Sequence, residues 1–159
     1  MDMTMTNIQT QKPQFIYETY IRAPADRVWE ALTKPEFTQQ YFHATSIEST
    51  WQVGASVRYL SQNGTAVEGE VLQIVPGESL SISWHVLYDD DAAREAPSRV
   101  TFSIEALAQQ TKLRIVHDSF PEASVVFKRI SQGWPWIIAS LKSLLETGEA
   151  LPDATPNGS

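Results

Sequence analysis

Three histidines, His43, His85 and His117, carry the side chains best suited to acid–base or metal chemistry near neutral pH. They are far apart in the sequence and lack the spacing typical of a zinc site, so we expect no metal. Alternation predicts that His117 shares the buried face of a strand with Leu113 and Ile115. There it would either orient or deprotonate a ligand, or be a core histidine hydrogen-bonded to the backbone.

Other catalytic patterns are weak. The chain has no cysteine, no glycine-rich phosphate loop and no Gly-x-Ser-x-Gly turn. Asp89-Asp90-Asp91 lacks the spaced oxygen ligands of a calcium loop and is more typical of a solvated loop. Glu68 and Glu70 fall on one face of a strand, either as paired carboxylates or facing solvent. We therefore predict no catalytic residue and no cofactor.

Composition limits the class of protein. The 159 residues suffice for one domain, and 42% of them are hydrophobic, which is typical of a globular chain. Twelve Lys and Arg against nineteen Asp and Glu give a net charge of −7, which disfavours nucleic acid and anionic membranes as partners. No apolar stretch is long enough for a signal peptide or a membrane span, and the lack of cysteine suits a cytoplasmic location.

Polar, turn-rich ends flank the expected folded unit. We expect a flexible N-terminal segment at 1–13, a single domain at 14–147 and a flexible tail at 148–159. The domain starts with a strand at 15–22 and two short helices that begin near Pro24 and Pro35. Alternating apolar residues then predict an antiparallel series of strands. These strands are expected at 46–51, 56–60, 65–75, 80–86, 99–105 and 112–118, with a polar loop at 89–97.

The C-terminal part changes to helical periodicity. From Phe127 to Leu145 apolar residues recur at steps of three and four, and Gly148 follows in the usual place for a helix end. Pro135 is unfavourable inside a helix. We therefore expect the main helix to begin or restart near Gly133, with Pro135 in its first turn; a kink is the alternative.

Several short motifs occur along the chain in a specific order. They are Ala23-Pro24, Val28-Trp29, Thr33-Lys34-Pro35-Glu36, Val53-Gly54, Gly69-Glu70-Val71, the strand from Leu80 to Trp84, Val100-Thr101-Phe102, Gly133-Trp134 and Leu141-Lys142-Ser143-Leu144-Leu145. Together they resemble the START-like (SRPBCC) superfamily, and within it the family of homologues of the activator of the ninety-kilodalton heat-shock-protein ATPase. The chain departs from that family at Tyr41-Phe42-His43, where a Trp followed shortly by Gly is common.

The resemblance implies an α+β helix-grip fold. In that fold a curved antiparallel sheet of six to seven strands wraps around a long C-terminal helix, with two short helices after the first strand. It also implies an apolar cavity between sheet and helix, which the inward strand faces would line; the alternative is that these residues fill a core without a cavity. The expected lining is Tyr41, Tyr59, Trp84, Phe102, Ile115, His117, Trp134, Ile137 and Leu141.

Three functions are compatible with this resemblance. The first is binding of a small apolar or amphipathic molecule in the cavity. The second is a cochaperone-like interaction with a partner protein, stimulating a heat-shock ATPase. The third is a cyclase, aromatase or hydrolase with His117 as general base. Fold alone does not choose among them, and the oligomeric state is open between monomer and homodimer.

Overall fold

The computed structural model describes residues 12–152. Residues 1–11 of the predicted flexible N-terminal segment (1–13) and residues 153–159 of the predicted tail (148–159) lie outside the described residues. The elements follow in the order β1 (Phe15–Ile21), α2 (Ala25–Thr33), α3 (Pro35–Tyr41), β2 (Ser46–Glu48), β3 (Ser56–Ser61), β4 (Gly64–Val75), β5 (Ser79–Val86), α4 (Asp90–Ala93), β6 (Ser98–Ala106), β7 (Thr111–Asp118) and α5 (Val125–Thr147).

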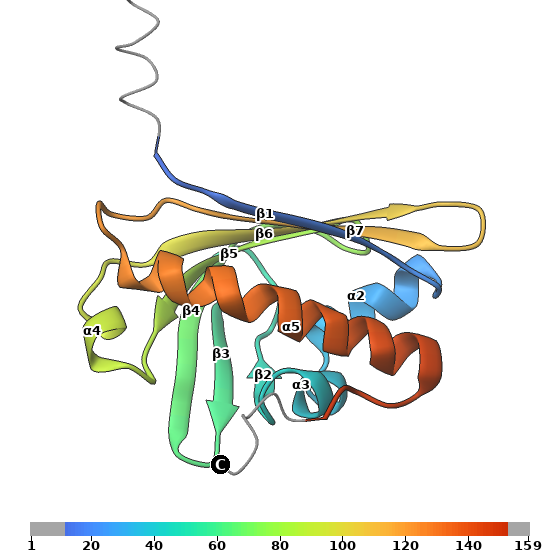
Figure 1. Cartoon of the computed structure of the whole chain (residues 1–159), viewed down its shortest axis with the longest axis horizontal. Helices are drawn as coiled ribbons and strands as arrows, with labels where there is room; N and C mark the ends of the chain where they lie inside the picture. Colours follow the sequence, from blue (N-terminus) through green and yellow to red (C-terminus); the bar gives the residue numbers. More distant parts are fainter. Residues whose placement is uncertain (1–11, 153–159) are drawn as a thin grey trace, which may run out of the picture.

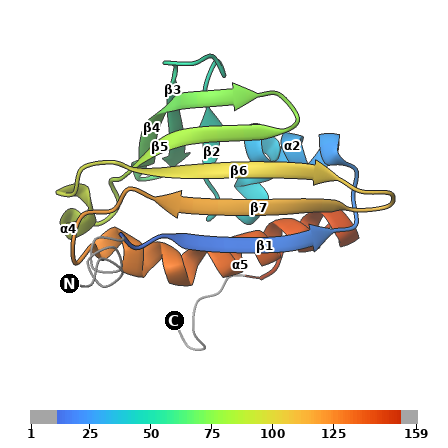
Figure 2. The ribbon, with the colours of Figure 1, turned by 90° about the horizontal axis from the view of Figure 1, so that it is seen from above.

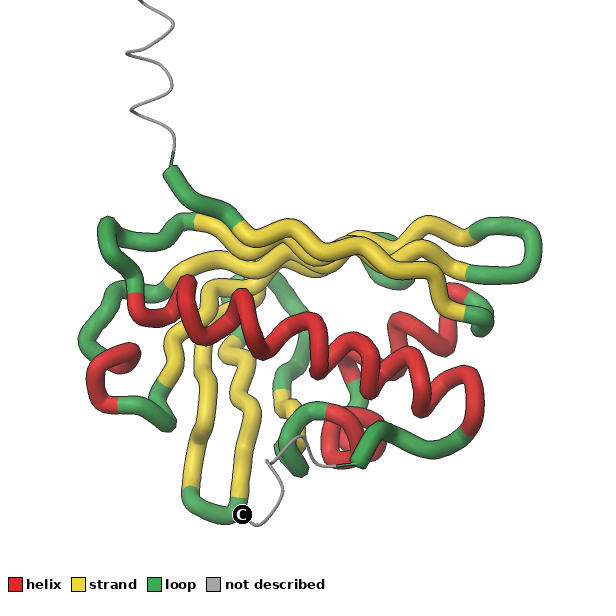
Figure 3. The backbone as a smooth tube through the Cα atoms, viewed as in Figure 1, coloured by secondary structure: helices red, strands yellow, loops and turns green. Residues whose placement is uncertain are grey.

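One antiparallel sheet of seven strands, in the order β1-β7-β6-β5-β4-β3-β2, forms one side of the molecule. Helices α2, α3 and α5 all lie on the same side of this sheet (Figure 3). Seen from above, α5 runs beneath β1, at one edge of the sheet (Figure 2). The predicted α+β helix-grip fold, with two short helices after the first strand and a long C-terminal helix, is confirmed.

The sheet bends sharply at β4. Strands β3 and β4 run crosswise to β1, β6 and β7, so the sheet encloses α5 from two sides (Figure 1). At Gly69 the backbone of β5 comes so close that an added Cβ would lie 1.8 Å from the carbonyl oxygen of Ser83. The Ser83 hydroxyl accepts a hydrogen bond from the Glu70 N–H at 2.9 Å, and the β4–β5 register shifts between Val71 and Gln73. Such irregularities allow a strand to turn a corner.

Burial alternates along the strands as the sequence pattern predicts. On β7, Leu113, Ile115 and His117 are completely buried, whereas Arg114 between them is exposed. The buried face packs against α5, where Trp134 and Leu141 are also inaccessible to solvent. Apolar area removed from water in this layer supplies most of the driving force for folding. Within residues 12–152, no helix combines the length and apolar character needed to cross a bilayer.

The prediction that the main helix begins near Gly133 is wrong. Helix α5 begins at Val125, after Ser124, whose hydroxyl oxygen accepts the Phe127 N–H at 3.0 Å. Pro135 lies inside the helix, where its ring crowds the carbonyl of Ser131 and its missing N–H removes one hydrogen bond from the series. The stabilisation from the buried face of α5 and from the Ser124 cap therefore exceeds the energetic cost of Pro135. The helix ends as predicted, at Gly148 with a left-handed φ of 88°.

Two smaller expectations also need correction. The strand expected at 46–51 is only the three-residue β2, because Trp51 has a φ of 60°, which no strand residue adopts. The polar loop expected at 89–97 contains the short helix α4. Asp89 caps this helix by accepting hydrogen bonds from the backbone N–H groups of Asp91 and Ala92 at 2.9 and 3.3 Å.

Candidate functional site

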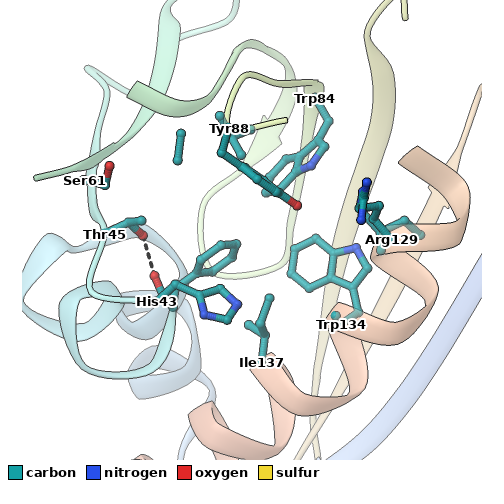
Figure 4. Close-up of a pocket in the computed structure, with 13 residues that line it drawn as sticks. His43, Thr45, Ser61, Trp84, Tyr88, Arg129, Trp134 and Ile137 are labelled. Carbon is teal, nitrogen blue, oxygen red and sulfur yellow. Dashed lines mark hydrogen bonds between the residues drawn. The ribbon is translucent and has the colours of Figure 1, made fainter. Parts of the chain in front are cut away.

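A cavity of about 360 Å³ lies between the middle of α5, the turn that follows α3, and the adjoining ends of β3, β4 and β5 (Figure 4). This volume falls in the roughly 300–1,000 Å³ range of small-molecule pockets. Its wall consists of Phe42, His43, Thr45, Ser61, Ala66, Val67, Trp84, Tyr88, Arg129, Ile130, Gly133, Trp134 and Ile137. We refer to it as the helix pocket.

The inner wall of the helix pocket is aromatic and aliphatic. Trp84 of β5 and Trp134 of α5 lie with ring centroids 5.4 Å apart. Phe42 contacts both rings, edge-on to Trp134 at 5.8 Å. Two polar wall residues already have partners, because Thr45 and Ser61 donate their hydroxyl hydrogens to the carbonyl oxygens of Phe42 and Gly64. The inner wall therefore offers a ligand mainly carbon surface.

Helix α5 supplies one continuous stripe of this wall. Arg129, Ile130, Gly133, Trp134 and Ile137 are spaced by one, three or four residues and so lie on one helical face. Gly133 is the gap in this stripe, since a Cβ added there would meet nothing within 4 Å. The absence of a side chain at Gly133 helps to keep the pocket open.

The turn after α3 places two aromatic residues differently. His43 and Ala44 both have a positive φ, 50° and 57°, which glycine adopts most easily. This turn includes Tyr41-Phe42-His43, where the sequence departs from the family that it resembles. The turn buries Phe42 in the pocket wall and leaves His43 exposed, stacked on Trp136 with ring centroids 5.3 Å apart.

The mouth of the pocket carries the polar groups. Arg129 forms an ion pair with Asp89, the residue that caps α4. Tyr88 is 62% exposed, and its hydroxyl end points to the side of the pocket where Arg129 and Trp134 lie (Figure 4). Desolvation raises the pKa of the Tyr88 phenol and the charge of Arg129 partly opposes this, so the hydroxyl is a neutral donor at neutral pH.

The structure brings three of the nine predicted lining residues, Trp84, Trp134 and Ile137, to the pocket wall. Tyr59 and Phe102 lie one layer deeper: Tyr59 stacks on Phe42 at 4.7 Å, and Phe102 packs edge-on to Trp134 at 5.8 Å. The other four, Tyr41, Ile115, His117 and Leu141, are buried and do not line the pocket. Tyr41 donates its hydroxyl hydrogen to the carbonyl oxygen of Ala31 at 2.7 Å, which links α3 to α2.

His117 is a fully buried core histidine with both ring nitrogens engaged. Nδ1 accepts the indole N–H of Trp134 at 3.1 Å, and Nε2 lies 2.7 Å from the hydroxyl oxygen of Ser98. Because an indole nitrogen can only donate, the proton of the neutral ring is on Nε2 and is donated to Ser98. Burial lowers the pKa of His117 to about 3, although the charge of Asp118 acts in the opposite direction.

These contacts decide how His117 can act. The ring has no unshared nitrogen to accept a proton from a ligand, and it does not itself line the pocket. The geometry matches the core-histidine alternative, with a serine hydroxyl and an indole as partners in place of a backbone carbonyl. It does not support the general-base role.

Sequence reasoning missed several wall residues. Arg129 and Gly133 could have been found, because they share the helical face of Trp134 and Ile137. Tyr88 could not, since it lies in a connecting segment where no periodicity predicts the direction of a side chain.

The carboxylates and the histidine on the other face of the sheet do not line the helix pocket. Glu68 and Glu70 are on the sheet face opposite α5, half-buried and exposed respectively. His85 is on the same face, with Nε2 2.8 Å from the carbonyl oxygen of Ala93. In the part of the chain that the structure describes, no three His, Asp or Glu side chains are grouped to hold a metal ion.

Solved structures from bacteria share this architecture. The Aha1 dimer from Colwellia psychrerythraea matches with a TM-score of 0.71 and 18% identity, over 87% of this chain and 99% of that one. Protein MLL2253 from Mesorhizobium loti matches with a TM-score of 0.72 and 26% identity, over 84% and 96% of the two chains.

DynU16, described as a putative protein in the dynemicin biosynthetic locus, has a TM-score of 0.73 and 25% identity over 88% of this chain. This chain corresponds to about half of that longer one, 49%. Among curated proteins, none is significantly similar in sequence. The sequence profile described as Activator of Hsp90 ATPase homolog 1-like protein matches residues 22–146, which is most of the chain. The chain belongs to this family.

Proposed function

We propose that this protein binds a small apolar or amphipathic molecule in the helix pocket. The observation that carries the proposal is the open, largely carbon-lined volume beside α5. Burying apolar ligand surface there would contribute roughly 25 cal/mol per Å², partly offset by the entropy lost on binding. The similarity to DynU16, a putative protein in the dynemicin biosynthetic locus, is compatible with this proposal.

The size and shape of the wall favour a flat ligand. Trp84, Trp134 and Phe42 present rings at several angles, between 46° and 86° to one another. Aromatic rings bind other rings best in such offset or edge-on arrangements. An aromatic or partly unsaturated molecule with one polar end would use the inner wall for its ring and the mouth for its polar group.

Native mass spectrometry of the purified protein, before and after denaturation, tests the proposal. We expect a reproducible non-covalent adduct that disappears on unfolding, or saturable binding of the neutral fluorescent probe N-phenyl-1-naphthylamine. Gly133→Leu should abolish either signal, because its side chain would enter the open volume, while Gly133→Ala should retain most of it. A clean protein mass together with no probe binding would contradict the proposal.

Membership of an activator-like family is the observation behind a second candidate, stimulation of a heat-shock ATPase. An ATPase assay with purified heat-shock protein distinguishes the two. Stimulation that persists in Gly133→Leu would assign this activity to a surface of the protein rather than to the pocket.

A further inference from the structure

The helix pocket differs in charge from the rest of the protein. The chain carries a net charge of −7, yet the pocket wall contains no Asp or Glu and one strongly basic side chain, Arg129. We infer that the ligand carries an acidic group and that Arg129 binds this group at the mouth of the pocket. The inference rests on the proposed function and specifies the class of ligand, an aromatic amphipathic anion.

Arg129 contacts Asp89 but still has hydrogen-bond donors available for a ligand. Its guanidinium group contacts the carboxylate of Asp89 through one terminal nitrogen. The other carboxylate oxygen of Asp89 is occupied by the backbone N–H groups at the start of α4. A guanidinium has five N–H donors in a planar fork, so the contact with Asp89 leaves donors for a second carboxylate or sulfonate. The Arg129 side chain is 49% exposed and can therefore be reached from outside.

Tyr88 adds a second donor at the same place. Its hydroxyl is neutral at neutral pH and points toward the side of the pocket where Arg129 lies (Figure 4). Desolvation raises the pKa of Tyr88, and the nearby charge of Arg129 partly opposes this shift. An acidic group placed between these two side chains would receive one charged and one neutral hydrogen bond, with its ring directed inward to Trp84 and Trp134.

Two fluorescent probes that differ by one sulfonate separate charge recognition from apolar binding. 8-Anilinonaphthalene-1-sulfonate is the anionic probe, and N-phenyl-1-naphthylamine is its neutral counterpart. In Arg129→Gln we expect the Kd of the anionic probe to rise about tenfold, the usual effect of losing one charge-assisted hydrogen bond. The Kd of the neutral probe should change by less than about twofold. Lys128→Gln, an exposed neighbouring cation, serves as the matched control and should affect neither probe.

A second variant tests whether the ion pair between Arg129 and Asp89, rather than a contact of Arg129 with the ligand, determines binding. Asp89→Asn removes the carboxylate but keeps Arg129, so binding of the anionic probe should be kept or strengthened. If Asp89→Asn weakens the anionic probe as much as Arg129→Gln does, Arg129 acts by anchoring α4 and the inference is wrong. Equal weakening of both probes in Arg129→Gln, or weakening of the anionic probe in Lys128→Gln, would also overturn it. Failure of both probes to bind the wild-type protein would contradict the proposed function itself.

Discussion

Trp134 donates its indole N–H to Nδ1 of His117, 3.1 Å away, and thereby connects the wall of the helix pocket to the interior of the sheet. The hydrogen bonds continue from Nε2 of His117 to the Ser98 hydroxyl, which in turn lies 3.4 Å from the carbonyl oxygen of Trp84. Each donor in this series meets an acceptor only when the imidazole is neutral. Protonation of His117 would place two N–H groups, of Trp134 and of Nδ1, against each other.

The first prediction concerns pH. The folded pKa of His117 is about 3, whereas an unfolded histidine has a pKa of about 6.5. Between these values the unfolded state binds a proton that the folded state does not, so the free energy of unfolding falls as the pH drops from 6.5 towards 3. From pH 7 to pH 5 the loss from this residue is about 2 kcal/mol. Urea denaturation at several pH values measures it.

His117→Gln is the control for this pH dependence, because it removes the titrating group. Its free energy of unfolding should vary less between pH 7 and 5 than that of the wild type. The ion pair between Arg99 and Asp118 does not interfere in this range, since Arg99 lowers the pKa of Asp118 below its usual value. An NMR titration in which the His117 ring protonates above pH 5 would contradict the prediction.

The second prediction concerns Ser98, which is buried on β6 and accepts the Nε2 proton of His117. Ser98→Ala leaves that buried N–H without an acceptor and should lower the free energy of unfolding by about 1–3 kcal/mol. Ser103→Ala is the matched control, because Ser103 is exposed on the same strand, and should cost less than about 0.5 kcal/mol. Equal effects of the two substitutions would show that the hydrogen bond does not stabilise the fold.

The third prediction concerns the corner of the sheet. In Gly69→Ala the new methyl group would lie 1.8 Å from the backbone oxygen of Ser83, so β4 and β5 must move apart. We expect a loss of about 3 kcal/mol or more in unfolding free energy, at or above the upper end of overpacking effects. Gly133→Ala has free space and removes a helix-interior glycine, so it should gain about 0.5–1 kcal/mol. Thermal and urea denaturation of both variants compare them directly.

Two outcomes would contradict this account of Gly69. One is a Gly69→Ala protein as stable as the wild type, which would mean that the bend can relax at little cost. The other is an equal loss in Gly133→Ala, which would show that glycine is needed at both positions for another reason.

The alternation along β5, β6 and β7 predicted the strands, because one face of each contacts water and the other contacts α5. The same rule failed for α5. Pro135 suggested a helix start near Gly133, but a local penalty for one proline is smaller than the packing of a helix whose buried residues extend from Val126 to Leu144. Sequence patterns report the local conformational preference of the chain, whereas the start of α5 at Val125 depends on burial against the rest of the fold.

The candidate site was less predictable than the fold. Alternation identified inward-facing aromatics such as Trp84 and Phe102, but it does not say which inward residue borders an empty volume and which is covered by another ring. That distinction depends on the turn at His43 and Ala44 and on the side chain that Gly133 lacks. His117 lies on the buried face that alternation predicts, but its partners Ser98 on β6 and Trp134 on α5, which occupy both ring nitrogens, cannot be inferred from the sequence.

The last prediction concerns the start of α5. Glu95, in the segment that follows α4, forms hydrogen bonds with this end of the helix. The Glu95 carboxylate accepts the Ser124 hydroxyl and the Val125 backbone N–H, each at 2.6 Å. Both are charge-assisted hydrogen bonds at a helix N-terminus, where a negative charge is favourable. Glu95→Ala should therefore lower the free energy of unfolding by about 1–2 kcal/mol and speed amide exchange in the first turn of α5. Glu122→Ala, which removes an exposed carboxylate near the same helix end, should change neither quantity appreciably. A faster exchange in both variants would mean that charge near the helix end, rather than the paired hydrogen bonds of Glu95, secures α5.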